Sequence, residues 1–172
     1  MKETLEISSV HLFVGKAKAY FELLKFRLSL LVAFSSGFGY ALASFGQINW
    51  SIFTMLFLGG LLVSGSSVTI NQIIEKDLDK LMKRTKDRPL PTERLTNREA
   101  TFFAIITGIV GLGLLFVSTN LLTVLLSALS LVLYSFVYTP LKRVGSIAVF
   151  VGAIPGALPP LLGWVAYTGT IG

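Results

Sequence analysis

A carboxamide and two carboxylates recur every four residues at the end of a long uncharged stretch, at Asn71, Glu75 and Asp79. At 100° per residue in an α-helix they lie within about 80° of one another, so their side chains can reach one object. Carboxylates four residues apart repel each other, and a carboxylate near a membrane is costly unless it has a partner. A hard divalent cation removes both costs, because Mg²⁺ prefers oxygen ligands and is commonly held by one or two carboxylates plus substrate phosphates. The spacing therefore predicts a metal site with Glu75 and Asp79 as ligands.

Basic side chains follow these acids directly, at Lys83, Arg84, Lys86 and Arg88. Arginine matches phosphate oxygens with two parallel hydrogen bonds, and lysine acts as a point charge. Acids that can hold a metal and bases that can hold phosphate together indicate a diphosphate site. Asp77 lies outside the helical stripe and is expected to serve a neighbouring ligand or a salt bridge. The competing interpretation is a solvated loop of a membrane protein, which charge content alone also fits.

A second polar point occurs in "YTPLKR", where Tyr138 and Lys142 stand at the end of another uncharged stretch. The charge pattern places them on the same membrane side as the first loop, so they are candidates for the same site. An interfacial tyrosine and a lysine that reaches toward water would look the same. Glycines and prolines interrupt the last uncharged stretch and predict a kinked or partly unwound helix, which either lines a ligand cavity or is simply bent. They are Gly152, Pro155, Gly156, Pro159 and Pro160.

The composition indicates a membrane protein. Hydrophobic residues make up 53% of the 172 residues and charged ones only 14%, against about 25% charged in a soluble domain. No Asp, Glu, Lys or Arg occurs in residues 28–74, 100–141 or 144–172, and one crossing needs about 20 apolar residues. Turn-forming residues at 46–49 and 118–120 divide the first two stretches. We therefore predict an all-α, polytopic membrane helix bundle of about five spans, at residues 28–45, 51–74, 100–117, 121–138 and 145–166.

The basic residues set the orientation. All 15 Lys and Arg lie in residues 1–27, 75–99 or 142–143, which five spans place on one side of the membrane. The positive-inside rule makes this side cytoplasmic, so we expect an integral membrane protein with its N-terminus and site loop in the cytoplasm. The net charge of +6 follows from this topology, and no basic groove indicates a nucleic-acid partner. Without cysteine, the chain has neither disulfides nor thiolate metal ligands.

Two cytoplasmic segments flank the predicted spans. Residues 1–27 carry apolar positions at helical spacing and are expected to form an interfacial helix. Residues 75–99 form a much longer connection than helices usually have, which favours a functional loop. Its start should continue the preceding helix, and "RPLP" should end that helix because Arg88 precedes a proline. "TNRE" (Thr96 to Glu99) is typical of a capping box that opens the next helix.

The stretch "NQIIEKDLDKLMKRTKDRPLP" resembles the first Asp-rich motif of the UbiA-type intramembrane prenyltransferases, Asn-x-x-x-Asp-x-x-x-Asp. Asn71, Glu75 and Asp79 occupy its positions, with Glu in place of the middle Asp. The additional acid at Asp77 and "MKRTKDRPLP" are similar to the branch of the family that farnesylates protohaem IX. "YTPLKR" resembles the family's Tyr-x-x-x-Lys motif, and "GAIPGALPPLLGW" is similar to the segment after it. The resemblance extends from about Tyr20 to the last residue.

This resemblance implies a bundle of about nine spans around a central cavity, of which residues 28–172 would be the N-terminal part. It implies Mg²⁺ as cofactor and transfer of a farnesyl group from farnesyl diphosphate to a vinyl group of protohaem IX, giving haem O. The setting it implies is the lipid bilayer of a bacterial inner membrane, and the family alone implies an association with haem A synthase or terminal-oxidase assembly. The alternatives are a prenyltransferase with another aromatic acceptor (a quinone or chlorophyll precursor), an inactive truncated fragment, or a non-catalytic membrane protein such as a transporter.

The resemblance also implies a role for each candidate residue. Ionising an allylic diphosphate builds negative charge on the leaving group, and fixed cations stabilise that charge where it develops. The residues that would hold the metal and the diphosphate are Asn71, Glu75, Asp77 and Asp79. The residues that would neutralise or support the departing diphosphate are Lys83, Arg84, Arg88, Tyr138 and Lys142.

Overall fold

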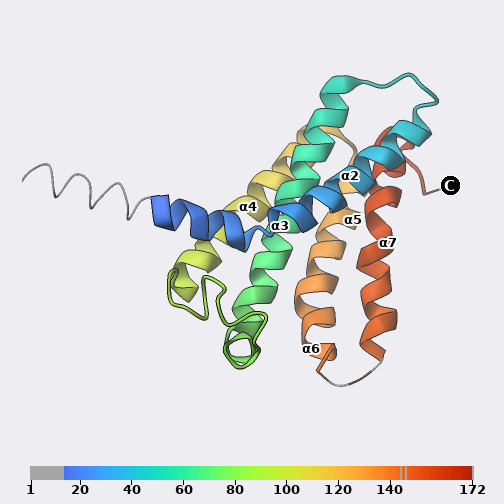
Figure 1. Cartoon of the computed structure of the whole chain (residues 1–172). Coiled ribbons are helices and arrows are strands. Elements are labelled where there is room, and N and C mark those ends of the chain that lie inside the picture. The colour runs from blue at the N-terminus through green and yellow to red at the C-terminus, as the bar shows by residue number, and fades with distance from the viewer. Residues whose placement is uncertain (1–13, 144, 146, 172) are drawn as a thin grey trace, which may run out of the picture.

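The protein folds as a bundle of helices (Figure 1). The computed structural model describes residues 14–143, 145 and 147–171, and none of these forms a strand, which confirms the predicted all-α class. Residues 1–13, the first part of the predicted N-terminal helix, lie outside the described residues. A helical segment at 14–23 comes first. The later elements are α2 (Phe26–Ala43), α3 (Trp50–Leu81), α4 (Asn97–Ser118), α5 (Leu121–Val132), a π-helical segment η1 (Leu133–Tyr138), α6 (Thr139–Leu141) and α7 (Ile147–Thr168).

The bundle has the surface of a membrane protein. Within the described residues, five helices are long and apolar enough to cross a bilayer: α2, α3, α4, the run Leu121–Leu141 and α7. Their outer faces carry large apolar side chains such as Ile109 and Phe150, which are 67% and 77% exposed. A surface of this kind drives association in water but is well solvated by lipid tails. The number of spans agrees with the prediction.

The two ends of the bundle differ in what they hold. Side-chain hydrogen bonds join Ser67 to Ser135 and Asn71 to Thr139, each pair 68 residues apart, so α3 and the α5–α6 run point in the same direction. One end, which we call the loop end, carries the loop after α3, the α6 turn and the start of α7 (Figure 1). The opposite end carries the α2–α3 connection and the end of α7. The predicted site residues therefore gather at the loop end.

Side chains cap the helices at the turns that the sequence predicts. Asn49 and Asn120 accept hydrogen bonds from backbone N–H groups in the first turns of α3 and α5. At α4, Thr96 and Glu99 form the reciprocal capping box, which confirms that prediction. These caps satisfy N–H groups that the start of a helix leaves without partners.

The helix that carries the acidic stripe ends earlier than predicted. α3 stops at Leu81, so the expectation that the prolines after Arg88 end it is wrong. The chain turns back because Leu90 and Leu95, each at most 1% exposed, pack in one apolar cluster with the helical segment 14–23. Burying these two side chains is worth about 2 kcal/mol each, more than a further turn of exposed helix would contribute.

α7 is a continuous helix in spite of Pro155, Pro159 and Pro160, so the partly unwound alternative is wrong. Prolines remove backbone hydrogen bonds, but in a membrane bundle a packed neighbour can hold the helix together. The irregular backbone lies instead in η1, where a π-helical turn interrupts the fourth span. Such turns are rare and frequently occur at functional sites.

Glycines let α2 and α7 touch backbone to backbone. A Cβ atom on Gly163 would collide with the carbonyl of Ser36, and a Cβ atom on Gly39 would collide with the carbonyl of Pro160. Small residues at helix crossings permit such close approach in membranes. The backbone of α2 is therefore the packed neighbour that holds α7 in place.

Gly163→Ala is expected to destabilise the bundle, because its methyl group has no room against α2. Overpacking of this kind costs about 1–3 kcal/mol, and thermal unfolding in detergent micelles should register it as a lower Tm. Gly156→Ala is the matched control, since it lies on the same helix and its Cβ would meet nothing within 4 Å. Equal Tm values for the two variants would contradict the close contact.

Candidate active site

The acidic stripe lies buried at the loop end of α3. Asn71, Glu75 and Asp79 are only 3%, 5% and 4% exposed. Buried carboxylates are strongly unfavourable unless a cation or hydrogen-bond donors satisfy them. Each of the two carboxylates has one cationic partner, which lies 67 residues further along the chain for Glu75 and nine residues further, in the following loop, for Asp79.

Glu75 pairs with Lys142. The Nζ atom of Lys142 lies 2.6 Å from Oε1 and 2.7 Å from Oε2 of Glu75, so one ammonium group bridges both carboxylate oxygens. Next to it, Arg143 donates a hydrogen bond to the carbonyl oxygen of Ile74 at 3.1 Å, which ties the α6 turn to α3. The two sequence motifs thus meet in space.

Asp79 pairs with Arg88 from the loop. The Nη1 atom of Arg88 lies 2.6 Å from Oδ2 of Asp79. Thr85 donates its hydroxyl hydrogen to the backbone carbonyl of Asp79 at 3.1 Å, which satisfies one acceptor at the end of α3 and shapes the turn. The early end of α3 is therefore what brings Arg88 back onto the stripe.

Hydrogen bonds fix the orientation of the Asn71 amide. Thr139 donates its hydroxyl hydrogen to the carbonyl oxygen of Tyr134 at 2.8 Å, so its oxygen accepts from Nδ2 of Asn71, also at 2.8 Å. This leaves Oδ1 of Asn71 as the atom available to a cation. The π-helical segment η1 places the Tyr134 carbonyl where Thr139 can reach it, which links the irregular backbone to the site.

Sequence reasoning missed Lys25, which the structure brings to the same place. Lys25 stands between the first helical segment and α2 in the left-handed backbone region, with φ 42°. That conformation is strained for a residue with a side chain and tends to occur at functional sites. Gln72 on α3 donates a hydrogen bond to the carbonyl oxygen of Leu23 at 2.7 Å, which anchors the chain just before the bend. The sequence signal that could have identified Lys25 is its position as the last lysine before an uncharged stretch.

The surroundings of Lys25 lower its pKa to about 8, chiefly because it is buried and because the charge of Arg88 opposes a second cation. Lys142 acts in the same direction, whereas the charges of Asp79 and Glu75 raise the pKa. Lys25 is therefore charged below pH 8 and loses its charge as the pH rises through 8. A base held in this way belongs to the same electrostatic group as the two ion pairs.

A shallow polar pocket of about 300 Å³ lies beside the stripe. Three cations line it, Lys25, Arg84 and Arg88, together with Glu22 and Asp87 among the other lining residues. Such a concentration of cations next to buried carboxylates suits an anion that is itself bound through a cation.

The remaining predicted site residues lie further out. Lys83 and Asp77 are exposed, and neither forms an ion pair within 4 Å among the described residues. Tyr138 is half-buried and packs its ring against Gly152 of α7, where a Cβ atom would come within 2.7 Å of it. Its ring also lies 5.4 Å from that of Tyr134, centroid to centroid. Lys142, Arg88 and Arg84 thus reach the site or its rim, whereas Lys83 and Asp77 do not contact it.

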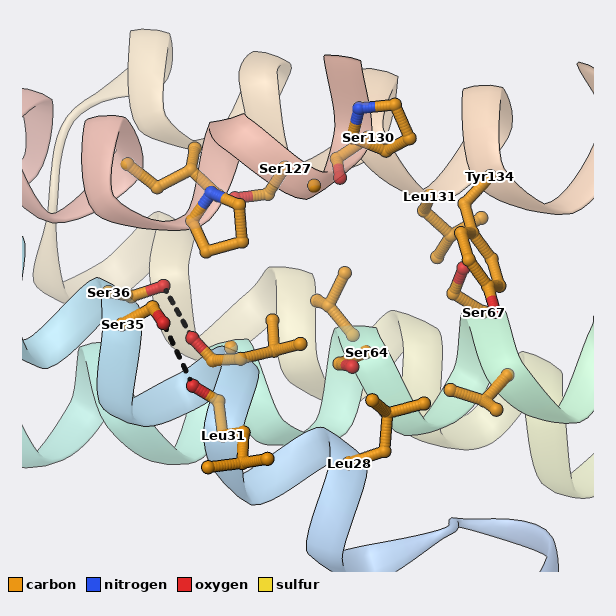
Figure 2. A pocket seen from close by; sticks show the side chains of 18 of the residues that line it. Leu28, Leu31, Ser35, Ser36, Ser64, Ser67, Ser127, Ser130, Leu131 and Tyr134 are labelled. Carbon is orange, nitrogen blue, oxygen red and sulfur yellow. Dashed lines mark hydrogen bonds between the residues drawn. The ribbon is translucent and has the colours of Figure 1, made fainter. Parts of the chain in front are cut away.

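An apolar cavity of about 320 Å³ opens beneath the site between α2, α3, α5–η1 and α7 (Figure 2). Its walls include Leu28, Leu31 and Leu131, with the glycine and proline positions of α7 on one side. The sequence left open whether this part of α7 lines a ligand cavity or is simply bent, and the structure shows that a cavity lies beside it. Polar groups at one end and apolar walls below match a ligand with a charged head and an apolar tail.

The donor set fits a divalent cation. An amide oxygen and two carboxylates are hard ligands, and two carboxylates completed by substrate phosphates is a usual arrangement for Mg²⁺. The described residues contain no group of three or more acidic, histidine or cysteine side chains that would hold a metal without the substrate. Asn71, Glu75 and Asp79 would hold the ion, and the cations that now neutralise the carboxylates would then face the phosphates.

Curated relatives are similar over most of the chain. A protoheme IX farnesyltransferase of Cytophaga hutchinsonii is 51% identical over 90% of this chain and 54% of its own length. One from Flavobacterium johnsoniae is 42% identical over 99% of this chain and 55% of its own length. A mitochondrial one from Arabidopsis thaliana is 44% identical over 90% of this chain and 36% of its own length. The chain thus spans about half the length of the bacterial relatives.

The fold has a counterpart among solved structures. A chain from a study of digeranylgeranylglyceryl phosphate synthase in membranes superposes with a TM-score of 0.79 at 24% identity, covering 88% of this chain and 53% of that one. At this identity the likeness concerns the fold alone. The model of the UbiA prenyltransferase family matches residues 30–172, which include the acidic stripe, its partner Lys142 and the cavity-lining residues from Leu31 onward. The chain belongs to the UbiA prenyltransferase family.

Proposed function

We propose that this chain forms part of a protohaem farnesyltransferase, which transfers a farnesyl group from farnesyl diphosphate to a vinyl group of protohaem and gives haem O. One observation carries the proposal: the buried stripe of Asn71, Glu75 and Asp79 meets Lys142 and Arg88 directly above an apolar cavity. A head site for a metal-bound diphosphate and a trough for an apolar chain are the two parts that a prenyl diphosphate requires. The names of the relatives support farnesyl as the group and protohaem as the acceptor.

The cations of the site act on the leaving group. As the bond between the first farnesyl carbon and oxygen breaks, negative charge accumulates on the diphosphate, and cations already fixed beside it stabilise that charge. Lys142 and Arg88 are held in place by Glu75 and Asp79, and Lys25 adds a third positive charge below pH 8. A bound Mg²⁺ would add further positive charge at the same oxygens.

The cavity walls protect the farnesyl cation from water. Although serines are frequent there, Ser35 and Ser36 donate to carbonyl oxygens of their own helix at 3.0 and 3.3 Å (Figure 2). Ser67 and Ser135 satisfy each other at 3.2 Å. Ser35, Ser36 and Ser67 thus use their hydroxyls within the protein and present mainly carbon to the hydrocarbon chain.

The proposed orientation in the membrane suits both the charged and the apolar parts of the substrates. The positive-inside rule supports a loop end on the cytoplasmic side, and we propose a bacterial inner membrane as the setting. A water-soluble diphosphate would then leave on the cytoplasmic side, while the farnesyl chain and the porphyrin come from the bilayer.

The test uses the intact protein in lipid nanodiscs with protohaem, farnesyl diphosphate and Mg²⁺, and mass spectrometry of the haem fraction. Haem that carries one farnesyl group is the expected product, and chelation of divalent metal should abolish it. Prenylation of a quinone precursor but not of protohaem would overturn the acceptor. Absence of any prenylated product with all acceptors would overturn the transferase assignment.

The charge of Lys25 predicts a pH dependence. A lysine whose pKa lies near 8 loses its charge between pH 7 and 9, so the affinity for inorganic diphosphate should fall about three- to tenfold over that range, relative to a variant that stays charged. Lys25→Arg is that variant, because arginine keeps its charge at every pH used. Competition of diphosphate with labelled farnesyl diphosphate measures both proteins. An equal decline in both would show that Lys25 does not contribute.

A further inference from the structure

The apolar cavity has a definite depth, set by the register of its helices. α3 and α5 run toward the loop end, whereas α2 and α7 run away from it. The lining residue farthest from the loop end is therefore the first one on α3 and α5 and the last one on α2 and α7. These four residues form what we call the cavity floor: Ser36, Gly60, Ser127 and Leu162.

Hydrogen bonds between α3 and the α5–α6 run check that Gly60 and Ser127 lie at one level. Ser67 and Ser135 face each other, and so do Asn71 and Thr139, at a constant offset of 68 residues. Two helical turns further from the loop end, the same offset of 68 residues pairs Ser127 with position 59, one residue from Gly60. The floor thus lies about 17 Å below Asn71, at 1.5 Å of rise per residue.

A farnesyl chain matches this depth. An extended carbon chain advances about 1.2 Å per bond, so the roughly eleven bonds between the first and last main-chain carbons of farnesyl span about 13 Å. With the first carbon a few ångströms below the head site, the last carbon reaches the floor. One further isoprene unit would add about 5 Å. The cavity volume of about 320 Å³ lies at the low end for ligand sites and leaves room for one such chain.

The structure below the floor is closed. Tyr40, Leu56 and Leu115, each 1% exposed, form a packed cluster with Val63 and Ala166. Tyr40, Leu56 and Ala166 each stand four residues beyond the floor residue of their own helix, so this cluster lies one turn below the floor. A fourth isoprene unit would have to displace side chains that are packed as closely as any protein core, at a cost of several kcal/mol.

Gly60 is the open position of the floor. A Cβ atom there would meet only the Cα atom of Ala33 and the hydroxyl oxygen of Ser36, both at an ordinary 3.9 Å, so the backbone of α3 leaves room for a side chain at this position. The side chain would occupy the space that the last isoprene unit needs. Ser127 lines the cavity on the opposite side, is 2% exposed, and has no hydrogen-bond partner for its hydroxyl among the described residues.

We propose that the floor formed by Ser36, Gly60, Ser127 and Leu162 selects the donor by length, and that the absence of a side chain at Gly60 admits the third isoprene unit. This inference rests on the proposed function, because it takes the acidic stripe as the site of the diphosphate. The floor residues touch only the far end of the chain and take no part in ionisation. They determine specificity between prenyl diphosphates of different length.

The test compares geranyl, farnesyl and geranylgeranyl diphosphate on the intact protein in nanodiscs with Mg²⁺, by competition binding and by turnover. The native protein should prefer farnesyl over geranylgeranyl diphosphate by at least tenfold. Gly60→Leu should weaken farnesyl diphosphate by about 10- to 100-fold, since it excludes several buried methylene groups at about 0.8 kcal/mol each. Geranyl diphosphate should change less than about threefold. Ser127→Leu should act in the same direction from the opposite wall.

Gly113→Leu is the matched control, because this glycine lies on the exposed face of α4, its Cβ would meet nothing within 4 Å, and it does not line the cavity. Inorganic diphosphate should bind Gly60→Leu as it binds the native protein, which shows that the head site is intact. If Gly60→Leu weakened all three donors equally, or none of them, the length selection would be refuted while the transferase assignment stood. If the native protein bound none of the three, the proposed function itself would fail.

Discussion

Replacement of Asp79 by Asn, or of Glu75 by Gln, is expected to reduce farnesyl transfer by about 10²–10³-fold, the loss typical of a preorganised electrostatic group at a reacting centre. Both changes keep the shape of the side chain and remove its charge. The carboxylates are only 4% and 5% exposed, so water has little access to take the place of a lost charge. Each substitution also releases a cation, Arg88 or Lys142, from its fixed position.

The dependence of turnover on Mg²⁺ concentration separates the loss of the carboxylate from the release of its cationic partner. If the carboxylates hold the ion, the concentration of Mg²⁺ needed for half-maximal turnover should rise at least tenfold in either variant. Glu93→Gln provides the control, because Glu93 is an exposed acid of the same loop with only a loose ion pair to Lys80 at 3.7 Å. Normal turnover and normal Mg²⁺ dependence in Asp79→Asn would overturn both the site and the proposed reaction.

The acidic stripe could be predicted from the sequence because its geometry is local. Asn71, Glu75 and Asp79 share one continuous helix, and helical spacing alone decides which side chains share a face. The pairing of Glu75 with Lys142 could be anticipated only in outline. The charge pattern places both on one side of the membrane, but the register between α3 and α6 depends on packing that spacing does not reveal.

The parts that could not be predicted depend on contacts between distant segments. α3 ends at Leu81 because Leu90 folds back onto the first helical segment. The burial of Leu90 outweighs the local preference to continue the helix as far as Arg88, where the following proline would have ended it. The same tertiary contact explains how Arg88 reaches Asp79. Lys25 was missed because its bend depends on Gln72, whose amide anchors a carbonyl of another segment.

The continuity of α7 has a similar origin. Three prolines in one helix locally favour a break, and a chain read residue by residue gives no reason against it. The backbone of α2 supplies that reason, since Gly39 and Gly163 let the two helices meet without side chains between them. The interruption appears instead in η1, where Thr139 uses the displaced carbonyl of Tyr134 to orient Asn71.

Replacement of Lys142 by Met should both destabilise the protein and abolish most of its activity, and a second substitution can separate the two effects. Lys142→Met leaves the carboxylate of Glu75 buried and unpaired, which should cost about 1–3 kcal/mol, since Lys142 is itself partly open to solvent. The Tm should fall by several degrees. Adding Glu75→Gln removes the unpaired charge, so the Tm of the double variant should return close to the native value.

Turnover should not return with it. Glu75→Gln alone is slow already, so it is the reference for the double variant. If Lys142 stabilises the departing diphosphate, the double variant stays at least about tenfold slower than Glu75→Gln alone, although its fold is restored. Lys142→Arg keeps the charge and should retain measurable turnover, with a geometry less suited to bridging both oxygens of Glu75. Equal turnover in the double variant and in Glu75→Gln alone would mean that Lys142 only holds α6 against α3. The meeting of the two sequence motifs would then be a structural contact and not a part of the reaction.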